Sequence, residues 1–161
     1  MGTDLFGFVE RKLGDSWVKV DYDLFPIRNY SVYAFLADVR NYDHCEPISE
    51  PRGLPEDSPY LNETYDDGWY MTTRRSDLLE GDYFCRTWLT LKELLAFDYD
   101  KVFWNRRVTK KEGNVWNGAA LAEEGEGRMI SYRDNLGDYY FNTLEDLKKF
   151  GEEVRIIIWF G

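Results

Sequence analysis

Residues 81–97, GDYFCRTWLTLKELLAF, contain the change of period that decides the fold class. From Tyr83 to Leu89 the stretch is rich in aromatic and β-branched residues, which favours a strand. Leucines then recur at helical spacing, so a helix is expected from Leu91 to Phe97. Thr90 and Glu93 match the capping box, in which the two side chains bond free N–H groups at a helix start. The segment therefore predicts a strand that runs directly into a helix.

The rest of the chain predicts further strands and two more helices around this junction. Short apolar runs bounded by turn residues indicate strands, and apolar residues at i, i+3, i+4 and i+7 indicate a helix. The last strand, VRIIIWF at 154–160, is apolar without alternation, which is typical of a strand buried on both faces. The expected strands are 4–10, 16–22, 83–89, 101–108, 115–121, 128–133 and 154–160, and the expected helices are Tyr30–Val39, Leu91–Phe97 and Leu144–Phe150.

These elements predict an α+β fold, with a mainly antiparallel sheet and about three helices in a single domain over residues 1–161. The spacing of hairpin-like segments favours antiparallel pairing, with a mixed sheet as the alternative. Residues 41–59 hold four of the five prolines together with Gly53, so they are expected to form a long proline-rich loop. Loops of this length inside compact domains are usually functional or mobile. Residues 60–79 show no clear period.

Composition limits the classes of partner. Thirty acidic and twenty basic residues give a net charge of −10, and the Lys and Arg residues do not cluster, which argues against a nucleic-acid partner. Twenty-eight aromatic residues argue against disorder. The longest apolar run, Ile156 to Phe160, is too short for a membrane span, and no signal-peptide pattern opens the chain. Cys45 and Cys85 are far apart, which suits a reducing compartment, so a cytoplasmic protein without a disulfide is expected.

Catalytic signatures are missing from the sequence. It contains no phosphate-binding Gly-rich motif and no G-x-S-x-G elbow, and His44 is its only histidine. No catalytic residue, metal ligand or cofactor is therefore predicted, since four consecutive polar residues at 43–46 cannot close a metal site alone. Carboxylate pairs such as Asp66 with Asp67 leave a carboxylate-dependent, metal-assisted enzyme as an alternative.

Several stretches carry a resemblance to a known family. They are GTDLFGFVE at 2–10, YAFLADVRN at 33–41, ISEPRGLPED at 48–57, FCRTWLTLKEL at 84–94 and VRIIIWF at 154–160. Together they resemble a family of small, largely uncharacterised proteins of bacteriophages and bacterial genomes. Its pattern opens Gly-[Cys/Thr]-Asp-Ile-His, continues through Val-Arg-Asn and Pro-Arg-Gly-Leu-Pro, and reaches His-Ser-x-Ser-Trp-Leu-Thr-Leu. The resemblance implies no established activity.

This chain departs from that pattern at both histidines, which are Phe6 and Phe84 here, and at the two serines, which are Cys85 and Thr87. If the histidines form a metal or catalytic site in relatives, this chain has lost it, because phenylalanine neither ligates a metal nor transfers a proton. The alternative, that the histidines only pack there, stays equally open. The paired replacement predicts that Phe6 and Phe84 touch or line one cluster.

The resemblance, together with the absence of catalytic signatures, favours a non-enzymatic, phage-type accessory protein that binds a host or defence protein or a small signal molecule in the cytoplasm of the host cell. A second hypothesis is a pocket for a small anionic, nucleotide-like ligand, held by Arg40 and Arg52. For these arginines the competing interpretation is a salt bridge that pins the proline-rich loop. The oligomeric state is not predicted. The candidate binding residues are Asp4, Phe6, Arg40, Asn41, Arg52, Gly53, Phe84, Thr87 and Trp88.

Overall fold

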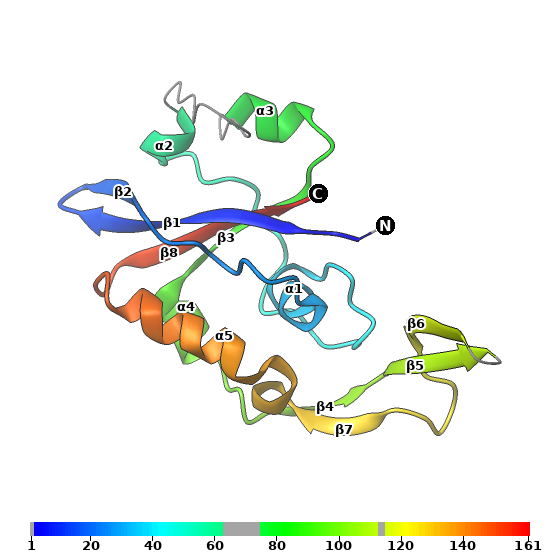
Figure 1. Cartoon of the computed structure of the whole chain (residues 1–161). Coiled ribbons are helices and arrows are strands. Elements are labelled where there is room, and N and C mark those ends of the chain that lie inside the picture. Colours follow the sequence, from blue (N-terminus) through cyan, green and yellow to red (C-terminus); the bar gives the residue numbers. More distant parts are fainter. Residues whose placement is uncertain (1, 63–74, 113–114) are drawn as a thin grey trace. The chain divides into compact units, whose positions relative to one another are not determined.

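The computed structural model describes residues 2–62, 75–112 and 115–161, and the chain divides into two compact units. Unit 1 comprises residues 1–28, 51–96 and 142–161, and unit 2 comprises residues 29–50 and 97–141. Neither unit is a continuous stretch of chain. The α+β class and the antiparallel sheet are confirmed, since every strand pair is antiparallel (Figure 1). The single domain over 1–161 stays a prediction.

Unit 1 is built on a four-stranded sheet with the order β2-β1-β8-β3. All seven residues of β8 are buried, and β8 pairs with a strand on each side, which confirms that VRIIIWF lies inside the sheet. The expected strands 4–10 and 16–22 are present as β1 and β2, which pair as an antiparallel hairpin. The four strands are β1 (Leu5–Leu13), β2 (Ser16–Val20), β3 (Phe84–Thr90) and β8 (Val154–Phe160).

Helices cover both faces of this sheet (Figure 1). On one face, α2 (Pro59–Asn62) and α3 (Arg75–Glu80) pack in a cluster with Phe8, Ile157 and Trp159. On the other, α4 (Leu91–Ala96) follows β3 without a gap. The capping box forms as expected, because the Thr90 amide donates to Glu93 Oε1 at 2.6 Å and the Glu93 amide donates to Thr90 Oγ1 at 3.2 Å.

Unit 2 has an aromatic core around Phe35 of α1 (Tyr30–Ala37). The Phe35 ring lies 4.9–5.8 Å from four other rings, those of Phe97, Tyr99, Tyr132 and Tyr140. The predicted strand 101–108 is divided at Arg106, and its halves pair with different partners: β4 (Val102–Asn105) with β7 (Arg128–Ser131), and β5 (Arg107–Glu112) with β6 (Val115–Leu121).

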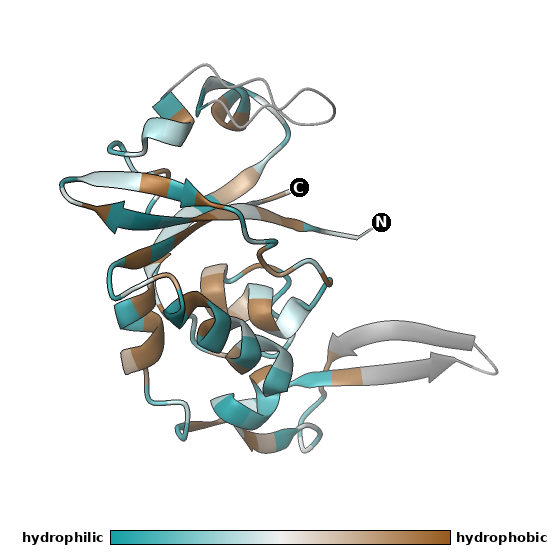
Figure 2. Ribbon diagram, turned by 60° about the vertical axis from the view of Figure 1, so that its left-hand side comes forward, coloured by the Kyte–Doolittle hydropathy of each residue, from teal (hydrophilic) through white to brown (hydrophobic). Residues whose placement is uncertain are grey.

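The last helix, α5 (Tyr132–Lys148), begins twelve residues before the expected start at Leu144, and the predicted strand 128–133 ends at Ser131. Gly137 has φ 74° and ψ 179°, so it interrupts the helical backbone and makes the helix harder to recognise from the sequence. Buried residues recur at helical spacing on both sides of it. The helix is mostly teal in Figure 2, since most of its residues are polar. Its first part belongs to unit 2 and its end, from Asn142, to unit 1.

Candidate functional site

Arg52 fixes the second half of the proline-rich loop, residues 51–59, on β3 in unit 1. Its guanidinium donates two hydrogen bonds of 2.6 Å to the Glu93 carboxylate and one of 3.2 Å to the Trp88 carbonyl. The same group lies 5.0 Å from the centre of the Trp88 ring, and the Arg52 amide donates to Thr87 Oγ1 at 3.0 Å. The Gly53 amide continues the contact by donating to the Arg86 carbonyl at 2.9 Å. Four predicted binding residues, Arg52, Gly53, Thr87 and Trp88, are thus brought together.

The bidentate pair with Arg52 contributes to the direction in which the pKa of Glu93 is shifted. Burial alone would raise the pKa of the Glu93 carboxyl, but the hydrogen bonds from Arg52 and from the Thr90 amide outweigh burial, so the pKa is lowered. Arg52 therefore reaches a carboxylate and a backbone carbonyl, which agrees with the interpretation of a salt bridge that pins the proline-rich loop. Its binding of an anionic ligand stays a prediction.

The other predicted residues of unit 1 lie elsewhere on the sheet. Asp4 forms an exposed ion pair with Arg28 at 2.8 Å. Phe6 pairs with Trp159 in the register of β1 and β8, and its ring contacts Tyr83. Phe84 pairs with Phe160, the neighbour of Trp159 along β8.

The predicted contact between Phe6 and Phe84 is therefore wrong. Consecutive residues of a strand point to opposite faces of the sheet, so Phe6 and Phe84 lie on opposite faces, with β8 between their strands. The two residues have no shared environment, because Phe6 packs with Tyr83 and Phe84 packs with Phe160.

Arg40 and Asn41 belong to unit 2, so the hypothesis of one pocket holding Arg40 and Arg52 has no geometric support within either unit. The Arg40 guanidinium lies 5.7 Å from the centre of the Tyr30 ring. The Asn41 side chain donates to Asp38 at 2.7 Å and to the Cys45 carbonyl at 2.8 Å, and it accepts from the Cys45 amide at 3.2 Å. Asn41 thereby closes the turn between these residues.

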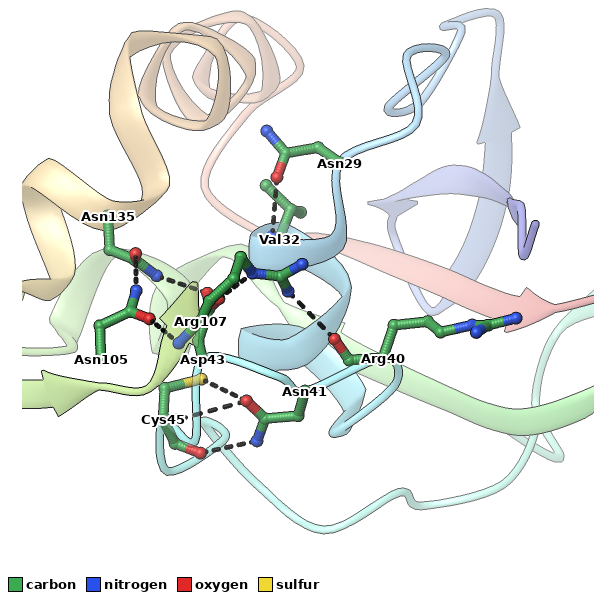
Figure 3. A network of polar contacts seen from close by, with 9 residues as sticks. All are labelled: Asn29, Val32, Arg40, Asn41, Asp43, Cys45, Asn105, Arg107 and Asn135. Carbon is green, nitrogen blue, oxygen red and sulfur yellow. Dashed lines mark hydrogen bonds and ion pairs between the residues drawn. The ribbon is translucent and has the colours of Figure 1, made fainter. Parts of the chain in front are cut away.

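A buried polar network holds this loop in unit 2 (Figure 3). Asp43 is fully buried, and its two carboxylate oxygens accept hydrogen bonds from Arg107 Nε and, at 2.9 Å, from Asn135 Nδ2. Arg107 also donates to the Arg40 carbonyl at 3.1 Å. A buried carboxylate is stable only when it is paired and hydrogen-bonded, and both conditions are met here. The network joins the loop to β5 and α5.

The same network fixes the end of β4. Asn105 Nδ2 donates to Asn135 Oδ1 at 2.7 Å, and Asn105 Oδ1 accepts from the Arg107 amide at 2.8 Å. The Arg106 amide donates to the Asp43 carbonyl at 3.0 Å. Because Asn105 follows Trp104 directly, these bonds immobilise the backbone that carries the Trp104 side chain.

Val102, Trp104 and Met129 form an exposed apolar surface on the β4–β7 ribbon, which we call the Trp104 face. Trp104 and Met129 are directly opposite in the register, and Val102 lies on the same face two residues before Trp104. Val102 is 55% exposed, Trp104 46% and Met129 57%. The other face of the ribbon is packed, with the Phe103 ring 4.8 Å from the Tyr132 ring. Sequence reasoning missed this face, since alternation shows that a strand has two faces but not which one is covered.

The indole of Trp104 is held in place despite its exposure. Its Nε1 donates to the Glu126 carbonyl at 3.0 Å. Gly127, with φ 96°, lies so close that a Cβ there would be 2.8 Å from Trp104 Nε1 and 2.6 Å from the Asn105 carbonyl oxygen. Gly127 therefore permits the turn to close over the indole.

Sequence reasoning also missed Arg155, the second residue of β8. Its Nε donates to Glu10 Oε1 at 2.9 Å, and its Nη1 donates to Asp57 Oδ1 at 2.8 Å. Its guanidinium lies 4.1 Å from the Trp17 ring centre, and Ser58 donates to the other Glu10 oxygen at 2.9 Å. A charged residue inside an apolar strand is the signal that indicates such a buried partner. We call these residues, Glu10, Trp17, Asp57, Ser58 and Arg155, the Arg155 cluster.

The described residues offer neither a reactive thiol at Cys45 nor a cluster of metal ligands. Burial, followed by the nearby Asp43 and Asp38 carboxylates, raises the pKa of the Cys45 thiol to about 12. Within residues 2–62, 75–112 and 115–161, no three His, Cys, Asp or Glu side chains gather as a metal site would need. The Asp66–Asp67 pair lies outside the described residues.

No protein-family model, curated protein or solved structure matches this chain. Among the helices of the described part of the chain, none combines the length and the hydrophobicity of a membrane-spanning helix.

Proposed function

We propose that this chain is a phage-type accessory protein that acts by binding another protein through the Trp104 face. The observation that carries this proposal is an exposed tryptophan held rigid beside an exposed methionine and valine. Trp and Met are enriched at protein–protein interfaces, and tryptophan is prominent among the few residues that supply most of the binding energy. The partner class, a host or defence protein, follows from the family resemblance.

Rigidity favours binding at this face. A side chain that is already immobilised loses little conformational entropy when a partner covers it. The bond from the Trp104 indole to Glu126, together with the buried bonds of Asn105, supplies this immobilisation before any partner arrives. In this proposal the Asp43 network assists binding indirectly, because it holds the end of β4 that carries the Trp104 side chain.

The test compares the wild-type chain with Trp104→Ala and with Leu79→Ala as the matched control. Leu79 is 55% exposed but belongs to α3 in unit 1, whereas the β4–β7 ribbon belongs to unit 2. Each tagged protein is used to capture partners from the cells that naturally contain it, and an enriched partner is then purified and titrated. Trp104→Ala should weaken the Kd by about 30-fold or more, as truncation of a binding hot spot does.

The melting temperature of Trp104→Ala should stay within a few degrees of the wild type, because the side chain is half exposed. Leu79→Ala should bind with wild-type affinity. Equal affinity of Trp104→Ala and wild type for the purified partner would refute the proposal, and so would an equal loss of affinity in the Leu79 control.

A further inference from the structure

A groove of about 610 Å³ lies in unit 1, between α4 and the turn that joins α5 to β8. Its volume falls in the range typical of sites for small molecules. The groove shares no residue with the Trp104 face, because all of its lining residues belong to unit 1 and the Trp104 face belongs to unit 2. It is lined by Leu91, Lys92, Leu95, Lys148, Gly151, Glu152 and Glu153.

The apolar part of the groove comes from one side of α4. Leu91 and Leu95 are one turn apart, so their side chains lie on the same helix face. Leu91 is buried, whereas Leu95 is 43% exposed. An apolar group placed against Leu95 would remove this leucine surface from water, which is favourable.

Opposite charges line the same groove. Lys148 is already neutralised, because its ammonium contacts Glu145 at 2.6 Å. The ammonium of Lys92 and the carboxylates of Glu152 and Glu153 have no ion-pair or hydrogen-bond partner among the residues that the structure describes. The groove therefore presents a cation and two anions that no internal contact satisfies.

We propose that this groove binds a small zwitterion with an apolar body, namely an apolar amino acid or a short apolar peptide with free ends. The ligand carboxylate pairs with Lys92, its ammonium pairs with Glu152 or Glu153, and its apolar side chains cover Leu95. Charge pairing favours this class. A fatty carboxylate would pair with Lys92 but leave both glutamates without a cation, and an apolar amine would leave Lys92 without an anion. A zwitterion pairs with Lys92 and with one glutamate, and the other glutamate stays in water.

The probe is the dipeptide leucyl-leucine, titrated into the isotopically labelled full-length chain and followed by amide NMR shifts. The Gly151 amide and its neighbours should shift in a saturable manner. Acetylation of the dipeptide amine, or amidation of its carboxylate, should weaken binding at least tenfold, because each removes one charge. Glycylglycine, which keeps both charges but has no apolar side chains, should bind at least tenfold more weakly as well.

Variants locate the site. Lys92→Glu should weaken leucyl-leucine binding at least tenfold, and Leu95→Ser should do the same by removing the apolar contact. Lys149→Glu is the matched control, because Lys149 is exposed at the end of α5 but does not line the groove, and it should bind like the wild type. Absence of saturable shifts, equal binding of the blocked dipeptides, or unchanged binding by Lys92→Glu would each overturn the proposal. None of these results depends on the Trp104 face.

Discussion

Replacement of Arg155 by methionine should destabilise the protein more than any other loss of a single ion pair that the structure describes. The Arg155 side chain is 3% exposed and the Glu10 side chain 0%. Methionine fills a similar volume but carries no charge, so the Glu10 carboxylate would keep only its bond from Ser58. Asp57, which is largely exposed, would regain water instead.

The expected magnitude follows from burial. Removal of one partner of a buried ion pair typically costs about 3–5 kcal/mol, because the other charge stays buried without compensation. For a chain of 161 residues this corresponds to a fall in melting temperature of about 6–20 °C. Addition of Glu10→Gln to Arg155→Met should recover at least half of the loss, since the neutral amide no longer needs a cation. Arg28→Met, which breaks the exposed pair with Asp4, should cost less than about 1 kcal/mol.

The assay is guanidinium chloride unfolding followed by circular dichroism, with the same four proteins heated in parallel. Circular dichroism is preferred to fluorescence because Arg155 contacts a tryptophan, so the variant changes the fluorescence signal directly. A loss below about 1 kcal/mol for Arg155→Met, or a double variant that is less stable than the single one, would show that Glu10 is not an uncompensated buried charge.

Three further predictions concern the proline-rich segment and Cys45. Arg52→Ala should lower the free energy of unfolding by about 1–3 kcal/mol and speed amide exchange in residues 52–54, because the bidentate bond to Glu93 is lost; unchanged exchange would contradict this role. The hydrogen bond from Arg155 lowers the pKa of Asp57, so the stability that Asp57 adds is present above about pH 4 and is lost as the pH falls through the lowered value. Denaturant midpoints of the wild type and Asp57→Asn should therefore differ at pH 7 and converge near pH 2, and a constant difference would refute this linkage. With its pKa raised to about 12, Cys45 has about one thiolate per ten thousand thiols at pH 8, so native protein should resist iodoacetamide at Cys45 for hours, as peptide mass spectrometry can check.

The sequence by itself determined the local elements of unit 1. The capping box at Thr90, the unbroken apolar run of β8 and the turn chemistry between β1 and β2 are all encoded by residues within a few positions of one another. Local steric and hydrogen-bond preferences suffice to place such elements, which is why the strand–helix junction and the central position of β8 were predicted. The pinning of the proline-rich loop by Arg52 was one of two interpretations of the sequence, and the identity of its carboxylate was not predicted.

Only the tertiary structure decided which distant residues meet. Glu10 and Arg155 are 145 positions apart, and Asp43 and Asn135 are 92 apart, so no periodicity links them. The opposite faces of Phe6 and Phe84 depend on the register of two strands with β8, and one residue of register reverses a face. The exposure of Trp104 likewise depends on which side of the β4–β7 ribbon packs on the core. Burial and strand register depend on contacts between residues that are far apart in the sequence. These contacts place the candidate sites of this protein, and local propensity does not.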